Sequence, residues 1–192
     1  YFPPMDKYFS ISAYRIGKDR FATIFEDVSE RRRAEKILRE SEEQFKALFE
    51  GANAAIFIAD RKTIVNCNHS AEELFGLSRD QLINRSLLDF SPELQPGGDQ
   101  SRKIAREKIE AALSGKPQVF EWVHIRHDHT PFDAEISLNR VLIRDEYFIQ
   151  GIVRDITDRK KAEAALRESE KKFSTVFKNS PVAHTLVAAT DG

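Results

Sequence analysis

The feature that most constrains this chain is an internal repeat. The segment DVSERRRAEKILRESEEQFKALFE begins at Asp27 and DITDRKKAEAALRESEKKFSTVFK begins at Asp155, so two ungapped copies lie 128 residues apart. The similarity extends to both sides: alternating apolar residues precede each copy, and GANAAIFIAD and NSPVAHTLVAATDG follow them. A repeat of this kind identifies the unit from which a chain is built. The sequence therefore predicts the end of one unit, one whole unit and the start of a third.

The repeat sets the expected domain boundaries within the 192 residues. Residues 1–28 are expected to be the last strands of a preceding domain, and residues 29–47 a connector helix. Residues 48–157 form the complete domain, residues 158–178 a second connector helix, and residues 179–192 the start of a following domain.

Composition excludes several classes of function. Lys and Arg number 30 against 31 Asp and Glu, so no broad basic surface for nucleic acid is expected. No run approaches the ~18 apolar residues of a membrane helix, which predicts no direct membrane contact. The single cysteine, Cys67, cannot form an internal disulfide or a multi-cysteine zinc site. It suits a reducing compartment, and we expect a cytoplasmic location.

Apolar spacing and turn residues predict the elements of the complete domain. Asn68 and Ser78 are candidate N-caps of two short helices, and Gln81 would complete a capping box with Ser78. A longer helix is expected to include Ile104 and Leu113. The expected strands are residues 55–59, 64–67, 119–126, 132–143 and 147–156. This order predicts an α+β fold with one antiparallel sheet and its helices on one face.

Three motifs make the sequence resemble the PAS domains of bacterial and archaeal sensor proteins. They are NHSAEELFGLSRDQLINRSLLDF at 68–90, FEWVHIRHDHTPFDAEISLNRV at 120–141 and GIVRDITDRKKAE at 151–163. Asp155, Ile156 and Thr157 match the family motif that ends the last strand and leads into a signalling helix, and residues 27–29 match it more loosely. The resemblance implies a five-stranded PAS fold flanked by amphipathic connector helices, in a tandem PAS region. It further implies a sensory or relay module, usually of a histidine kinase, whose output domain lies outside this chain.

The connector helices carry an apolar stripe with heptad-like spacing, which predicts a weak coiled-coil seam. In the second connector the seam residues are Ala162, Leu166, Ser169 and Phe173, and in the first Ala34, Leu38, Ser41, Phe45 and Leu48. Ala and Ser bury little apolar area, so pairing of two chains over these few turns is expected to be marginal. We predict a homodimer in which residues 155–157 pass a change in the sheet to the helix pair. The alternative is a connector helix that packs on its own domain.

The sequence predicts no catalytic residue and no metal site. His124, His127 and His129 lie close together, but no cysteine or carboxylate completes a recognised metal spacing, and the latter two fall in an expected turn. Haem-binding members of the family have a histidine on or near the long helix, which is absent from residues 92–115. Blue-light flavin members need a reactive cysteine, and the comparable stretch here is Asn-Arg-Ser at 84–86. No cofactor is predicted, although flavin or another small ligand stays open.

A pocket, if open, would lie between the sheet and the helices. Its expected lining is Ile56, Ile58, Phe75, Phe90, Ile136 and Leu138, with no charged residue directed into it. Strict alternation would place Phe120 and Trp122 together on one face, which we assign to the outside of the sheet as a docking surface. Two functions therefore stay open: a small-molecule sensor, and a ligand-free dimerisation and relay module that contacts neighbouring PAS and output domains.

Overall fold

The computed structural model describes residues 1–178, with all side chains except those of residues 4 and 176–178. The chain divides after Gly51 into two compact units. The expected start of a following domain, residues 179–192, lies outside the described residues. None of the described helices is both long and apolar enough to cross a membrane.

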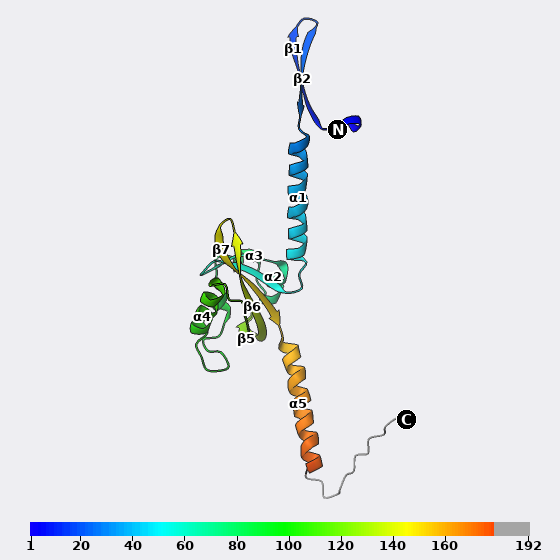
Figure 1. The fold of residues 1–192 in the computed structure, drawn as a ribbon. Coiled ribbons are helices and arrows are strands. Elements are labelled where there is room, and N and C mark those ends of the chain that lie inside the picture. The colour runs from blue at the N-terminus through cyan, green and yellow to red at the C-terminus, as the bar shows by residue number, and fades with distance from the viewer. Residues whose placement is uncertain (179–192) are drawn as a thin grey trace, which may run out of the picture. The chain divides into compact units, whose positions relative to one another are not determined.

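The first unit consists of a short 3-10 helix η1 (Pro3–Met5), a hairpin of β1 (Phe9–Gly17) and β2 (Arg20–Asp27), and the helix α1 (Ser29–Glu50) (Figure 1). The two strands are antiparallel, and both carry large apolar side chains that are exposed to solvent. Ile11, Phe21 and Phe25 are 61%, 75% and 65% exposed, respectively. A two-stranded hairpin with so much exposed apolar surface is marginally stable by itself.

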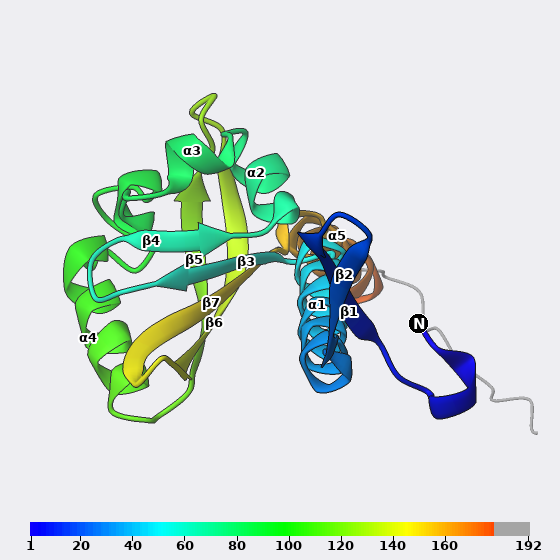
Figure 2. The ribbon, with the colours of Figure 1, turned by 90° about the horizontal axis from the view of Figure 1, so that it is seen from above.

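The second unit is built on a five-stranded antiparallel sheet (Figure 2). The strands are β3 (Ala55–Ala59), β4 (Ile64–Cys67), β5 (Gln118–Ile125), β6 (Pro131–Ile143) and β7 (Glu146–Asp155), in the spatial order β4-β3-β7-β6-β5. Helices α2 (His69–Phe75), α3 (Arg79–Leu82), η2 (Leu87–Phe90) and α4 (Ser101–Leu113) connect β4 to β5. The predicted α+β class and sheet are therefore confirmed.

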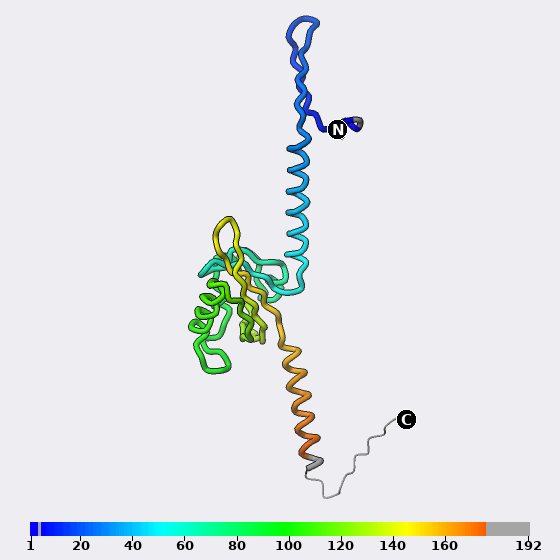
Figure 3. Tube along the Cα trace, in the orientation of Figure 1, coloured from blue at the N-terminus to red at the C-terminus, as the bar shows by residue number. Residues whose placement is uncertain are grey.

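A last helix, α5 (Thr157–Lys178), follows the sheet directly, because the single residue Ile156 separates it from β7 (Figure 3). So short a link leaves little freedom between strand and helix. The direction in which α5 leaves the domain therefore depends on the end of β7.

One face of the sheet carries the core. Along β6, Ala134, Ile136 and Leu138 are buried, while the alternating residues between them are partly exposed, as predicted. Phe75 of α2 is fully buried, and its ring lies 5.3–5.6 Å from four other rings. These rings belong to Phe57, Phe90, His124 and Phe132.

The predicted orientation of β5 is wrong. Trp122 is only 5% exposed and lies on the core face with His124, whereas Val119 is 66% exposed. The alternation itself is correct, but its phase is inverted. The reason is the pairing with β6, in which Trp122 lies opposite the buried Ala134, so that the aromatic residues of β5 extend the core.

Asn68 joins the start of α2 to the neighbouring strand. Its side chain is fully buried, and Oδ1 accepts hydrogen bonds from the amides of Ile56 (2.8 Å) and Ala71 (3.2 Å). Nδ2 donates to the carbonyl of Ala54 (3.0 Å). The predicted N-cap is confirmed, and the same side chain also fixes β3.

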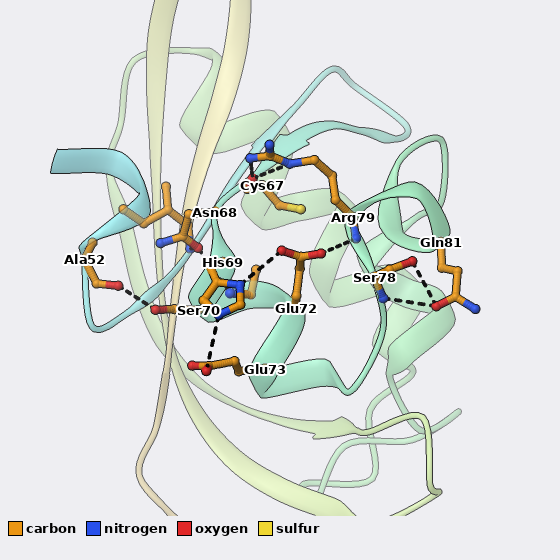
Figure 4. Close-up of polar contacts among 12 residues, drawn as sticks. Ala52, Cys67, Asn68, His69, Ser70, Glu72, Glu73, Ser78, Arg79 and Gln81 are labelled. Carbon is orange, nitrogen blue, oxygen red and sulfur yellow. Dashed lines mark hydrogen bonds and ion pairs between the residues drawn. The ribbon is translucent and has the colours of Figure 1, made fainter. Parts of the chain in front are cut away.

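A second group of polar contacts holds α3 against α2 and β4 (Figure 4). The carboxylate of Glu72 accepts from the amide of Arg79 at 2.6 Å, and the Arg79 guanidinium donates to the carbonyl of Cys67. The predicted capping box of Ser78 and Gln81 is also present. These contacts position the helical layer over the sheet.

We predict that Asn68→Ala lowers the free energy of unfolding by about 3 kcal/mol, because it removes the side-chain partner of the Ile56 amide and of the Ala54 carbonyl and the N-cap of α2. Asn139→Ala, which removes a partly exposed amide from β6, should cost below about 0.5 kcal/mol. Urea denaturation of both variants measures the difference. Equal losses of unfolding free energy in the two variants would show that the buried hydrogen bonds of Asn68 add no more stability than a partly exposed amide does.

Candidate functional site

A cavity of about 80 Å³ lies between the core face of the sheet and the helices η2 and α4. Its walls are mostly apolar, with Phe57, Ile64, Leu88, Ile109 and Trp122 among them. The turn between β3 and β4, residues 60–63, forms its rim, where residues 60–62 are exposed. A volume of roughly 10–15 Å³ holds one water, so this cavity has room for a small molecule but is far below the ~300 Å³ of common ligand sites.

Gly151 is one reason for the cavity. It lies in β7 between Phe57 of β3 and Leu138 of β6, facing the core. A Cβ atom there would meet Leu138 Cδ2 at 3.5 Å, which is ordinary van der Waals contact. The missing side chain therefore leaves usable space in the middle of the sheet.

The structure divides the predicted pocket residues into groups. Ile136 and Leu138 line the cavity, whereas Phe75 and Phe90 are buried in the adjoining core without forming its wall. Any binding role of these residues stays a prediction.

Ile56 and Ile58 do not line the cavity. They lie on the opposite face of β3, where they are partly exposed, and Phe57 between them faces the core. The predicted strand is correct and its phase is wrong by one residue, because a continuous apolar run such as AIFIA gives no alternation from which to choose the inner face.

The deepest polar group of the cavity is His124, which is 2% exposed. Its Nδ1 lies 2.9 Å from the carbonyl oxygen of Phe90, so Nδ1 carries the proton and donates to it. Nε2 is buried and has no hydrogen-bond partner among residues 1–178 as the structure describes them. Burial lowers the pKa of His124 from 6.5 to about 4, against the opposing effect of the Phe90 bond. The ring is therefore neutral at pH 7.

Beside this histidine, the indole Nε1 of Trp122 donates to Ser91 Oγ at 3.0 Å. Ser91 Oγ also lies 3.3 Å from the carbonyl oxygen of Leu87, to which it donates. The deep wall of the cavity thus contains polar groups but no charge.

The burial of His124 was not predicted, because the sequence places this residue in one cluster with His127 and His129. The structure places those two in the exposed turn between β5 and β6, away from the cavity. The missed signal was the alternation with Trp122, since the two residues are two positions apart on one strand.

The exit from the sheet is held by backbone and side-chain bonds around Asp155, Ile156 and Thr157. The Asp155 carboxylate accepts from the Thr157 amide at 2.8 Å. The Asp133 amide donates to Thr157 Oγ1 at 3.0 Å, and its carbonyl accepts from the Ile156 amide at 2.9 Å. The predicted exit motif therefore joins β6, β7 and α5 at one point, which we call the exit junction.

Arg126, at the end of β5, connects the exit junction to the helical layer. Its guanidinium donates to the Asp155 carboxylate and to the carbonyl oxygen of Leu74 in α2. Partial burial alone would raise the pKa of Asp155, but the bonds from Thr157 and Arg126 lower it overall. Asp155 is therefore ionised over the physiological range.

Lys160 ties the first turn of α5 to the outer face of the sheet. Its ammonium group lies 2.7 Å from Glu121 of β5 and 2.9 Å from Asp133 of β6. These two carboxylates raise the pKa of Lys160. Arg159 lies 3.8 Å from the same Glu121.

The first unit contains a second exit junction. The Val28 amide donates to the carbonyl of Tyr8 at 2.9 Å, and the Tyr8 amide donates to Ser29 Oγ at 2.8 Å. The Ser29 amide donates to the Asp27 carboxylate at 3.1 Å. Each bond has its counterpart at residues 155–157, although only Asp27 and Asp155 are identical.

The predicted seam of α5 is exposed within its own unit. Leu166 and Phe173 are 62% and 67% exposed, and Ala162 and Ser169 are also exposed. The helix therefore does not pack this stripe on its own domain. This finding argues against the alternative interpretation of the connector.

We predict that His124 makes the protein less stable in weak acid. Because its pKa is lower in the folded than in the unfolded protein, the unfolded protein binds more protons between pH 6.5 and about 4. The stabilisation is complete above pH 6.5 and is lost as the pH falls, by about 3 kcal/mol in total.

Denaturant titrations of the wild type and His124→Phe between pH 7.5 and 4.5 measure this effect, because the other titrating groups are common to both proteins and cancel in the comparison. The unfolding free energy of the wild type should fall relative to that of His124→Phe as the pH falls. Parallel curves would contradict the assignment.

Comparison with known proteins agrees with these features. A family model described as the PAS domain matches residues 53–158. Sporulation kinase E of Bacillus subtilis is 33% identical over 162 residues, which cover 83% of this chain and 21% of that protein. The sensor protein FixL of Bradyrhizobium diazoefficiens is 26% identical, over 82% of this chain and 31% of that protein.

Solved structures show the same fold. The PAS domain of an HTR-like protein from Haloarcula marismortui superposes with a TM-score of 0.56 at 25% identity, covering 65% of this chain and 99% of that one. The chain spans about a fifth to a third of the length of the curated relatives named above. The family model matches more than half of the chain. The chain belongs to the PAS domain family and contains a sensory signalling module.

Proposed function

We propose that this chain is part of a multi-domain sensor kinase in which PAS domains act in series, each passing its state through an exit junction to the helix that follows. The observation that carries the proposal is the repeated set of hydrogen bonds at residues 27–29 and 155–157. The relation to Sporulation kinase E supports a kinase as the parent protein.

The hairpin of the first unit supports a preceding PAS domain at residues 1–28. Ile11 pairs with Phe25 as Ile136 pairs with Val153, at the same distance in register from the junction aspartate. In the complete domain this pair is 6% and 1% exposed, against 61% and 65% in the hairpin. The exposed pair therefore has the pattern of a core face whose remaining partners come from the rest of a PAS domain.

Alternation along β5 provides the physical route from the cavity to the helix. Trp122 lines the cavity on the inner face, and the next residue, Glu121, binds Lys160 of α5 on the outer face. A ligand that displaces Trp122 moves the strand and therefore the carboxylate that holds α5. The cavity would act as the sensor, and α5 would carry its state to an output domain outside this chain.

The exposed stripes of α1 and α5 support pairing with a second copy of the chain. Leu38 and Phe45 of α1 are 61% and 64% exposed, and the corresponding residues of α5, Leu166 and Phe173, are exposed to a similar extent. Two such helices would bury these side chains against each other in a homodimer. A ligand-free dimerisation and interaction module is the second candidate function, favoured by the small size of the cavity.

We predict that Leu166→Glu, combined with Leu38→Glu, shifts the protein toward the monomer, because each charge would lie in the paired seam. Sedimentation velocity measures the dimer fraction over a range of concentrations. The matched control for the substitution in α5 is Ala164→Glu, which adds one negative charge at an exposed position outside the stripe and is compared with Leu166→Glu alone. Dimer content equal to that of the wild type would remove the paired helices from the proposal.

We further predict that Thr157→Val loosens the start of α5. The variant has nearly the same shape but leaves the Asp133 amide without its acceptor. Hydrogen exchange in residues 157–162 should accelerate about tenfold, which corresponds to ~1.4 kcal/mol of local opening. Thr175→Val, on the exposed surface of the same helix, is the control. Unchanged exchange at the junction would contradict its role in holding the helix.

A further inference from the structure

We infer that the cavity binds a short-chain monocarboxylate, with its apolar tail inside and its carboxylate at the rim. The inference rests on the proposed sensing role of the cavity and assigns the class of molecule that it senses. The residues expected to line the pocket carry no charge, but the turn of residues 60–63 also belongs to its lining. This turn carries the charges that select the ligand.

Arg61 and Lys62 form the cationic part of the rim. Both are exposed, and within the described residues neither side chain forms an ion pair. Elsewhere in the chain many exposed cations have a carboxylate partner, such as Arg106 with Glu110. Two adjacent cations that form no ion pair within the described residues, with only the Asp60 carboxylate acting on Lys62, leave favourable interactions for an anion at the mouth of the cavity.

The acidic residue of the same turn does not neutralise them. Asp60 Oδ1 accepts hydrogen bonds from the backbone amides of Lys62 (2.6 Å) and Thr63 (2.7 Å). These bonds lower the pKa of Asp60, so its charge is present but is used to close the turn. The two side-chain cations still exceed the single carboxylate.

The interior of the cavity determines which end of the ligand enters it. The Ser91 hydroxyl is already bonded to Trp122 and Leu87, and the His124 ring is neutral. A carboxylate moved to this depth would lose its hydration without gaining a cation. The charged group therefore stays at the rim, and the tail enters.

The volume limits the length of the tail. An engineered cavity of ~150 Å³ binds benzene, so a cavity of about 80 Å³ holds an apolar tail of roughly three to four carbon atoms. Pentanoate meets this limit. Larger planar cofactors exceed the space that is present.

Trp122 makes the test direct, because it is the only tryptophan of the chain and lines the cavity. Its fluorescence is titrated in the full 192-residue chain with pentanoate, pentanol and pentylamine, which share a tail and differ in the polar head. Inorganic phosphate serves as an anion without a tail. Pentanoate should give a saturable change and bind about tenfold more tightly than pentanol, while pentylamine and phosphate should give none.

The variants separate the head from the tail. Arg61→Gln with Lys62→Gln should bind pentanoate about tenfold more weakly and leave pentanol binding unchanged. The matched control is Arg102→Gln with Lys103→Gln, an adjacent pair of exposed cations on α4 that does not line the cavity, which should bind as the wild type. Gly151→Ala should weaken both ligands by narrowing the cavity, and its melting temperature shows that it folds.

Equal affinities for pentanoate and pentanol, or an unchanged affinity in the Arg61 and Lys62 variant, would overturn the carboxylate assignment. No saturable fluorescence change with pentanoate would also overturn it. The relay proposal is judged separately by hydrogen exchange in α5, because Thr157→Val can loosen that helix whether or not any acid binds. Failure of the ligand assignment is thus distinguishable from failure of the relay.

Discussion

The structure depends on the twofold alternation of side chains along β5 and β6. A strand is one residue thick, so neighbouring positions face opposite environments. Trp122 and Ile136 face the core and its cavity, while Glu121 and Asp133 face outward and hold Lys160. The hydrophobic core, the cavity and the anchor of α5 are thus arranged on the same two strands. These two strands therefore connect the cavity directly to the anchor of α5, without a further helix or strand between the two.

The buried polar groups of the domain are uncharged, whereas charged groups surround the exit junction. Inside, the imidazole of His124 is neutral and the side-chain amide of Asn68 carries no charge. The hydrogen bonds of Asn68 hold α2 to β3, and that of His124 holds β5 to η2. At the exit junction and the adjoining turn of α5, Asp155 pairs with Arg126, and Lys160 pairs with Glu121 and Asp133. Charge is therefore found where the domain meets the helix that follows it, and is absent where it would need to be desolvated.

Much of the fold followed from the sequence because its signals were local. The capping bonds of Asn68 and Ser78 reach residues only three positions away, and the alternation of β6 reveals its buried face. The phase of β3 and β5 was predicted wrongly, because it depends on strands that are distant in the sequence. The cavity was missed in part for the same reason: Gly151, Arg61 and Trp122 come together only through the sheet. Burial of His124 likewise follows from the phase of β5.

Gly151 has a consequence for how such a domain can diversify. The space it leaves lies in the centre of the sheet, yet a Cβ atom would fit there in ordinary contact. Its counterpart in the hairpin of the first unit is Thr23, as the repeat aligns them. The exit junctions of the two units make the same hydrogen bonds, whereas the residue at the position of Gly151, which leaves space for the cavity, differs between them. A single substitution at this position can thus change the space available to a ligand in such a domain, while the exit junction that connects the domain to the following helix stays the same.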